Sequence, residues 1–170
     1  MRVLGVDPGT WRTGVGILDF EKGACNPVHY EVLWLQGKSK KDYQELSKRL
    51  RKIHDSLTEV FKIYKPDVMA LEDVFYGQDF KAAVRIGEAR AVAILAATEF
   101  DVRVSEYSPT QVKSAVCGNG RASKIQIQYM VRHLLKLREN PPADAADALA
   151  VAICHCHSSK YVQLSTGNSR

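Results

Sequence analysis

Three things are scarce in this chain: cysteines, long apolar runs, and acidic residues between Lys113 and Arg138. Only four cysteines occur in 170 residues, which is no disulfide framework for a chain of this length and fits a reducing compartment. No apolar run approaches the length of a membrane span, and the first residues lack the charge pattern of a signal peptide. We therefore expect a cytoplasmic protein that does not contact a membrane.

The charges that are present are mostly basic. Lysine and arginine number 24 against 19 aspartates and glutamates, a formal net charge of +5. Six of the basic residues fall in the stretch from Lys113 to Arg138, which contains no carboxylate. A solvated surface is the usual fate of such a run, but the lack of acids across three consecutive elements favours phosphate binding. The residues expected to contact nucleic acid are Lys113, Arg121, Lys124 and Arg132.

Hydrophobic periodicity and turn residues predict alternating strands and helices in one domain. This domain is expected to span 1–157, followed by a polar, flexible tail over 158–170. The predicted strands are 2–7, 13–19, a segment within 28–36, 68–72 and 102–107. The predicted helices are 46–64, 79–99, one that starts at Pro109, 123–137, and one that starts near Pro142.

The connections between these elements predict how the strands pair. The first three strands are joined too tightly for parallel crossovers, so they are expected to be antiparallel. The later strands are linked by helices, so they are expected to be parallel. The fold class is therefore α/β, with a mixed five-stranded sheet flanked by helices.

Four acidic residues stand where a metal-dependent site would need them. Asp7 and Glu72 each end an apolar strand, at the edge where open α/β sheets place their sites. Asp144 and Asp147 lie three residues apart at the start of an alanine-rich helix, on one face of it. A carboxylate in apolar surroundings is costly unless it is paired or holds a metal. An all-oxygen cluster of this kind suits Mg²⁺ or Mn²⁺.

Each of these features also has a simpler explanation. Asp7 could cap the Pro-Gly turn that follows it, and Glu72 could be an exposed charge at a strand end. Asp144 and Asp147 could complement the helix dipole. The run Cys154 to His157 looks like a zinc pattern, but adjacent helical residues face different directions, so we assign it to core and surface positions.

Beyond these positions, the order and spacing of several motifs resemble a known family. The chain resembles the RuvC-type Holliday junction resolvases of the ribonuclease-H-like superfamily from residue 2 to about residue 157. The motifs that carry the resemblance are GVDPGT at 5–10, LEDVF at 71–75, IGEARAVA at 86–93, QVK at 111–113, NPPADAADALA at 140–150 and HCH at 155–157.

The resemblance implies a ribonuclease-H-like fold and a homodimeric, Mg²⁺-dependent endonuclease. Such an enzyme nicks two opposing strands of a four-way DNA junction during recombination and repair. Matching positions imply that the metal-binding catalytic carboxylates are Asp7, Glu72, Asp144 and Asp147. They imply two catalytic lysines near the scissile phosphate, Lys113 and Lys124. They also place an aromatic ring, Phe75, at the junction centre. Two Mg²⁺ ions per site are expected, with Mn²⁺ able to substitute. RuvA and RuvB are the implied protein partners.

The same resemblance places the alanine-rich helix 79–99 at the dimer interface, although its small side chains could equally form an intramolecular core. The small and apolar face considered for this role comprises Ala82, Ala83, Ile86, Ala89, Ala93, Ile94 and Ala97.

Two other functions stay open on the sequence alone. An ATP-binding protein of the actin and sugar-kinase type shares an Asp-x-Gly-Thr hairpin, but such proteins carry a second phosphate loop and about twice the length. A junction-binding protein without catalysis is the other, and it would gain nothing from four carboxylates near phosphate. Nucleotide binding and Mg²⁺-dependent nicking are the discriminating observations.

Overall fold

The first strands form a continuous antiparallel ribbon. The computed structural model describes residues 1–35, 43–73 and 80–167. Strand β1 (Arg2–Asp7) pairs antiparallel with β2 (Arg12–Glu21), which pairs antiparallel with β3 (Ala24–Trp34). The apolar residues of β1, and those of β2 as far as Leu18, are buried on both faces, as expected for strands in the centre of a sheet.

Two parallel strands complete the sheet on the other side of β1. Strand β4 (Val68–Glu72) pairs parallel with β1, and β5 (Arg103–Tyr107) pairs parallel with β4. The strand order is β3-β2-β1-β4-β5. The predicted mixed five-stranded α/β sheet is confirmed, with β1 at its centre.

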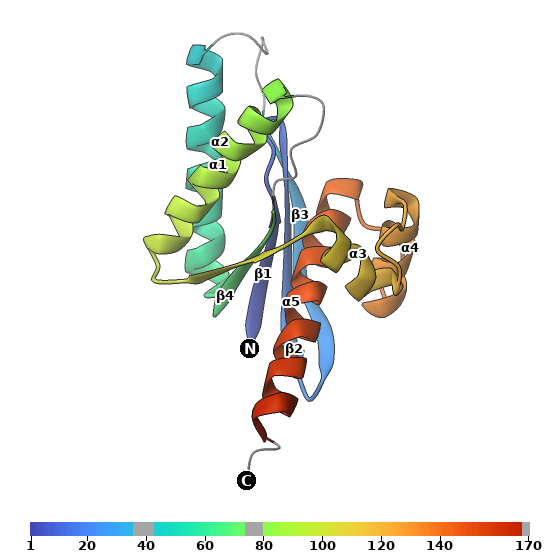
Figure 1. Ribbon diagram of the computed structural model, residues 1–170. Coiled ribbons are helices and arrows are strands. Elements are labelled where there is room, and N and C mark those ends of the chain that lie inside the picture. The colour runs from blue at the N-terminus through green and yellow to red at the C-terminus, as the bar shows by residue number, and fades with distance from the viewer. Residues whose placement is uncertain (36–42, 74–79, 168–170) are drawn as a thin grey trace.

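Helices cover both faces of this sheet (Figure 1). One face carries α1 (Tyr43–Tyr64) and α2 (Phe80–Thr98). The other carries three helices: α3 (Pro109–Cys117), α4 (Lys124–Leu134) and α5 (Ala143–Gly167). Each face has its own apolar core. Among the described residues, no helix is both long and apolar enough to cross a membrane.

Several boundaries differ from those predicted, three of them in ways that matter for the fold. Strand β3 begins at Ala24 rather than near Val28, because β3 is an edge strand and tolerates Pro27 beside a register shift that leaves Val28 without a partner residue in β2. Helix α4 ends before the predicted residue 137, where Lys136 adopts a φ of 53°. Helix α5 continues to Gly167, so the backbone of 158–167 is helical where we expected the tail; the flexibility of that segment stays a prediction.

The alanines of α2 face mainly inward. Ala89, Ala93 and Ala97 are fully buried in the core between α2, α1 and the sheet. The expectation that these three line a dimer interface is therefore wrong. Small side chains there let α2 approach its own chain closely, which is the intramolecular alternative. A different face of α2 remains exposed.

The contact between α5 and the sheet is made by backbone against backbone. A Cβ at Gly5 would collide with the carbonyl oxygen of Ala148, and one at Gly14 with the carbonyl oxygen of Asp144. The facing residues of α5, including Ala145 and Ala148, are small and fully buried. Because glycine has no side chain, it allows this close approach. The N-terminal turn of α5 is thereby held directly above β1 and β2.

We predict that Gly14→Ala destabilises the protein and misplaces the start of α5. The added methyl must displace the Asp144 carbonyl, and overpacking of this kind costs about 1–3 kcal/mol. Chemical denaturation monitored by circular dichroism measures the loss. An unchanged unfolding midpoint would show that α5 does not rest on Gly14.

Candidate metal centre and nucleic-acid interface

Two of the four carboxylates are brought together by the pairing of parallel strands. Val6 of β1 pairs with Leu71 of β4, so the next residues, Asp7 and Glu72, end adjacent strands at the same edge. Both are partly buried. The turn after Asp7 is held by Thr13, whose buried hydroxyl donates to the Gly9 carbonyl at 2.9 Å. The conformation of the backbone that follows Asp7 is therefore constrained.

The other two carboxylates come from the first turns of α5. Asp144 and Asp147 are separated by one helical turn, and their side chains are 23% and 22% exposed. The contact of the Asp144 backbone with Gly14 sets the distance between this turn and the sheet. Strands β1 and β4 and helix α5 thus bring their acidic residues to one place.

The electrostatics indicate that the four act on one another. The pKa of Asp7 is raised from 3.8 to about 7. Burial is the largest cause, the charges of Asp147, Glu72 and Asp144 add to it, and Lys124 opposes them. Burial also raises the pKa of Glu72, with a further contribution from Asp147. The carboxylates therefore form one mutually repelling cluster in partly dehydrated surroundings.

Two cations partly neutralise this cluster. The Nζ of Lys124 lies 2.9 Å from Oδ2 of Asp147, and this contact raises the pKa of Lys124. The Nε of Arg12 lies 3.3 Å from Oδ2 of Asp144. Each carboxylate of α5 is therefore turned toward its own basic partner, one from α4 and one from β2.

The donor set fits a divalent metal in its chemistry. Within the described ranges, no three acidic, cysteine or histidine side chains are already placed as a metal-binding group. The oxygens of Asp7, Glu72, Asp144 and Asp147 are nevertheless the ligands that Mg²⁺ prefers. Their mutual repulsion is what a dication would relieve. Each ion pair involves only the Oδ2 atom, so a metal would compete with Arg12 for Asp144 and with Lys124 for Asp147.

Capping interactions fix the helices that carry the basic residues. Helices α3 and α4 each begin with a reciprocal capping box, made by Ser108 and by Ser123. The charge of Lys113 on α3 opposes the rise in the pKa of Glu72, which indicates that this charge lies near the cluster. Lys124 is the first residue of α4 and reaches Asp147. The structure thus brings both predicted lysines to the carboxylates.

The two predicted arginines lie further out. Arg121 is exposed before α4, and Arg132 is exposed in the last turn of α4. Eight residues separate Arg132 from Lys124, which is roughly 12 Å along the helix. These arginines extend the basic surface away from the cluster. Phe75 lies outside the described residues, so its predicted place at the junction centre stays a prediction.

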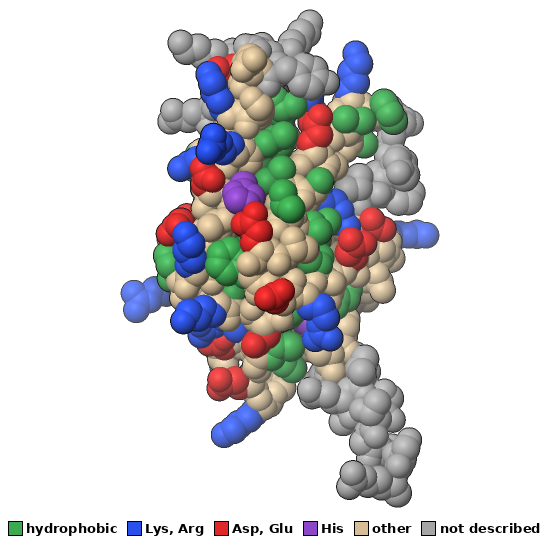
Figure 2. Space-filling view, turned by 90° about the vertical axis from the view of Figure 1, so that its left-hand side faces the viewer, with side chains coloured by type: hydrophobic (Ala, Val, Ile, Leu, Met, Phe, Trp, Pro, Cys, Tyr) green, Lys and Arg blue, Asp and Glu red, His purple; other side chains and the backbone are tan. Residues whose placement is uncertain are grey.

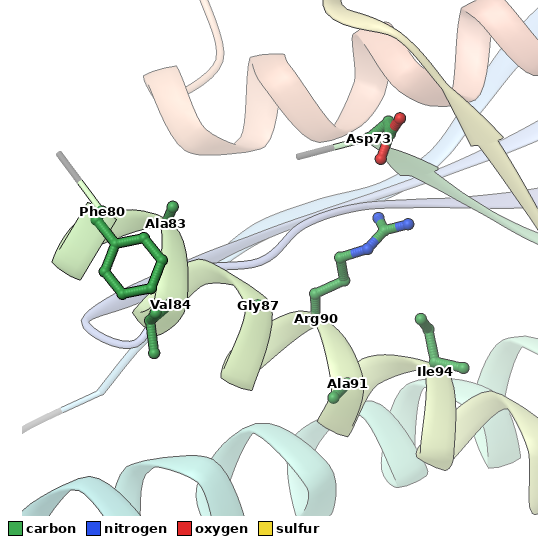
Figure 3. A pocket seen from close by; sticks show the side chains of 8 residues that line it. All are labelled: Asp73, Phe80, Ala83, Val84, Gly87, Arg90, Ala91 and Ile94. Carbon is green, nitrogen blue, oxygen red and sulfur yellow. The ribbon is translucent and has the colours of Figure 1, made fainter. Parts of the chain in front are cut away.

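Two arginines at the site were missed by sequence reasoning. Arg12 contacts Asp144, and Arg90 of α2 donates from Nη1 to the backbone oxygen of Glu72 at 2.8 Å. Arg90 also pairs with Glu106 of β5, and Figure 3 shows it extending from α2 toward the end of β4. No local pattern marks Arg12, and the IGEARAVA motif that contains Arg90 does not indicate its contact with Glu72, because each contact joins segments distant in sequence.

The histidine and cysteine run is structural, in line with the prediction. Cys154, His155 and Cys156 are buried in α5. The Nδ1 of His155 lies 2.7 Å from the Tyr107 hydroxyl, and burial lowers the pKa of this imidazole. His155 is therefore a neutral core residue that links α5 to β5.

Comparison with known proteins identifies a family with this architecture. The profile of "Crossover junction endodeoxyribonuclease RuvC" matches residues 3–155. The RuvC of Caldanaerobacter subterraneus subsp. tengcongensis is 43% identical over 164 residues, 96% of each chain. That of Shewanella baltica is 44% identical over 167 residues, 98% of this chain and 93% of its own.

Solved structures agree with these sequence matches. Thermus thermophilus RuvC superposes with a TM-score of 0.83 at 34% identity, covering 95% of this chain and 97% of its own. The same protein in complex with a Holliday junction substrate has a TM-score of 0.82 at 31% identity, covering 95% and 96%. The yeast mitochondrial Holliday junction resolvase Ydc2 shares the fold, with a TM-score of 0.70 at 15% identity and coverage of 95% and 80%.

We predict that Asp7→Asn stabilises the metal-free protein, and more so at high pH. The folded pKa of about 7 exceeds the ordinary 3.8, so the native state binds the proton more tightly than the unfolded state between these values. Stability contributed by protonated Asp7 is present at pH 4 and is lost as pH rises through 7. At pH 8 the gain from Asp7→Asn should be about 2–4 kcal/mol.

Thermal unfolding in EDTA at pH 5 and pH 8 checks this prediction. The difference in Tm between Asp7→Asn and the unmodified chain should widen toward pH 8. Equal melting temperatures at pH 8 would mean that Asp7 carries no electrostatic strain.

Proposed function

Since the chain belongs to the RuvC family of crossover junction endodeoxyribonucleases, we propose that it resolves four-way DNA junctions by metal-dependent nicking of two opposing strands. The observation that carries this proposal is the convergence of four carboxylates from β1, β4 and α5 beside Lys113 and Lys124. A junction-binding protein without catalysis would have no use for that cluster. The family match over residues 3–155 disfavours an ATP-binding protein of the actin type.

Asp7, Glu72, Asp144 and Asp147 are the residues that would hold two Mg²⁺ ions, with Mn²⁺ as a substitute. Metal ions among these carboxylates would lower the pKa of the attacking water and stabilise the leaving 3′ oxygen. Asp7, at the centre of the sheet, lies between Glu72 on β4 and the two aspartates of α5. It would therefore hold metal together with the carboxylates on either side of it.

The protein's cations orient and neutralise the reacting phosphate. Lys113 and Lys124 already lie within electrostatic reach of the cluster, so a phosphate held there would meet both. Positive charge placed where negative charge builds in the transition state lowers the barrier. Arg121 and Arg132, further along the same surface, would bind the backbone of the arm beyond the cut.

A homodimer would present two such sites to the two-fold symmetry of a junction. The exposed face of α2 offers a suitable stripe, in which Val84, Gly87, Ala91 and Leu95 recur at helical spacing. Part of it lines a hollow of about 560 Å³ between α2 and the end of β4 (Figure 3). Apolar side chains run down this side of the molecule (Figure 2). Small residues within the stripe allow two helices to approach closely.

Three further features rest on the resemblance to the family. They are Phe75 at the junction centre, RuvA and RuvB as partners, and a cytoplasmic location. Each remains part of the proposal.

Incubation with a synthetic mobile four-way junction tests the proposed function. With Mg²⁺ the protein should nick two strands of like polarity at symmetric positions, and with EDTA it should bind without cutting. Equal cutting of linear duplex DNA of the same sequence, or no cutting with either metal, would contradict the proposal.

We predict that removing single carboxylates abolishes cleavage but spares binding. Asp7→Asn, Glu72→Gln, Asp144→Asn and Asp147→Asn should each lower the single-turnover rate by a factor of about 10² or more, because a metal ligand is lost. Junction affinity should stay equal or rise, since a negative charge near phosphate is removed. Loss of affinity in a folded variant would count against the assignment.

We predict that the basic residues divide into two roles. Lys113→Ala and Lys124→Ala should slow single-turnover cleavage by about 10²-fold with little change in affinity. Arg121→Ala and Arg132→Ala should weaken binding and reduce the salt slope by about one unit each. Titrations at several salt concentrations, set beside cleavage rates, separate the roles. Identical small effects of all four would refute the division.

We predict that Ala91→Arg breaks the dimer without unfolding the protomer. Ala91 is exposed within the α2 stripe, and a C2 contact would meet the new charge twice. Sedimentation equilibrium should show a monomer that melts as before and nicks strands without coordination. The matched variant Ala93→Arg should instead lose the fold, because Ala93 is fully buried. A dimeric Ala91→Arg protein would move the interface elsewhere.

A further inference from the structure

Arg12 lies between a carboxylate of the cluster and an exposed aromatic ring. It is the first residue of β2 and pairs across strands with Trp34, the last residue of β3. Its guanidinium carbon lies 5.6 Å from the Trp34 ring centroid, while its Nε lies 3.3 Å from Oδ2 of Asp144. Arg12 thus has two partners that hold it at the edge of the site.

Neither contact is explained by folding stability. The Arg12 side chain is 53% exposed and that of Trp34 is 67% exposed, so water screens the ion pair and little of the ring is buried. Exposed ion pairs and cation–π contacts of this kind contribute little to stability. A large aromatic ring left open beside a cation is, however, the composition of a nucleic-acid contact.

The position of the pair relative to the cluster supports this use. Lys113 acts on Glu72 of β4, on one side of Asp7 in the sheet. Arg12 and Trp34 lie on β2 and β3, which are on the opposite side. A DNA strand that crosses Asp7 from the β4 side would therefore reach Arg12 and Trp34 next. Without them that side of the cluster would offer the phosphate mainly carboxylates.

The ion pair between Arg12 and Asp144 also indicates how Arg12 becomes available to bind a phosphate. A metal on Asp144 would draw negative charge away from its contact with Arg12, just as a metal on Asp147 would weaken its contact with Lys124. When metal binds the carboxylate, the guanidinium is held less strongly by Asp144 and can move to a phosphate, while the Trp34 ring still supports it. Arginine then presents parallel N–H donors that match a phosphate.

We propose that Arg12 and Trp34 form a further DNA-binding patch, in which Arg12 exchanges Asp144 for a backbone phosphate of the junction when the carboxylates hold metal. The patch contacts the strand on the β2–β3 side of the scissile position. Trp34 holds the guanidinium plane and packs against the sugar-phosphate chain. This inference rests on the proposed nuclease function and adds to it residues outside the predicted site.

The test is the salt dependence of junction binding at saturating Mg²⁺, in a Glu72→Gln background that leaves the junction uncut but keeps Asp7, Asp144 and Asp147 to hold metal. Arg12→Gln should reduce the slope of log K against log salt by about one unit. Arg12→Lys, which keeps the charge, should retain the slope. Trp34→Leu should weaken binding several-fold with the slope unchanged. Lys22→Gln is the control, because Lys22 is exposed at the other end of β2, roughly 30 Å away.

A second readout separates phosphate binding from a positioning role. Mn²⁺ binding to the DNA-free protein, measured by calorimetry with Glu72 intact, should tighten several-fold in Arg12→Gln because a competitor for Asp144 is removed. If Arg12 only oriented Asp144, Mn²⁺ binding would weaken and the salt slope would not change, which overturns the inference. An equal slope change in Lys22→Gln overturns it too. Cleavage by the unmodified chain, assayed in parallel, reports separately on the proposed function.

Discussion

The direct contact between the backbone of α5 and the glycines of β1 and β2 is the constraint on which the site depends. Gly5 and Gly14 leave room for the carbonyls of Ala148 and Asp144, and any side chain there would lift the helix. Because α5 packs so closely against the sheet, the carboxylates in its first turns reach those at the ends of β1 and β4. The alanines of α5 are the other half of the same contact.

This closeness has an electrostatic cost that the protein offsets with cations. Burial and neighbouring carboxylates raise the pKa of Asp7 to about 7. Lys124 and Arg12 each hold one aspartate of α5, and Arg90 holds the backbone of Glu72 from the opposite face of the sheet. These cations thus stabilise the cluster when no metal is bound. A metal can then compete with them for the carboxylates, and a phosphate can compete with the carboxylates for the cations. Since Arg90 comes from α2, the same helix that offers the exposed apolar stripe also supports the position of Glu72.

Local sequence patterns predicted most of the fold and the acidic part of the site. The bounds of β1 and the mixed sheet follow from turns and connection lengths, and the acids stand out because they end apolar strands or begin a helix. Pro27 concealed the start of β3, since its tolerance depends on the strand being at an edge. The inward face of α2 was misjudged because alanine suits both a core and an interface. Arg12 depends on tertiary contacts with Trp34 and Asp144, which sequence spacing does not reveal.

Crystals of the protein soaked with Mn²⁺ and measured for anomalous scattering would test the central claim most directly. The account predicts manganese peaks bounded by Asp7, Glu72 and the first turn of α5, with Lys124 and Arg12 moved off Asp147 and Asp144. Manganese bound elsewhere, or ion pairs unchanged beside a vacant cluster at saturating Mn²⁺, would contradict the claim that the contact of α5 with the sheet builds a metal centre.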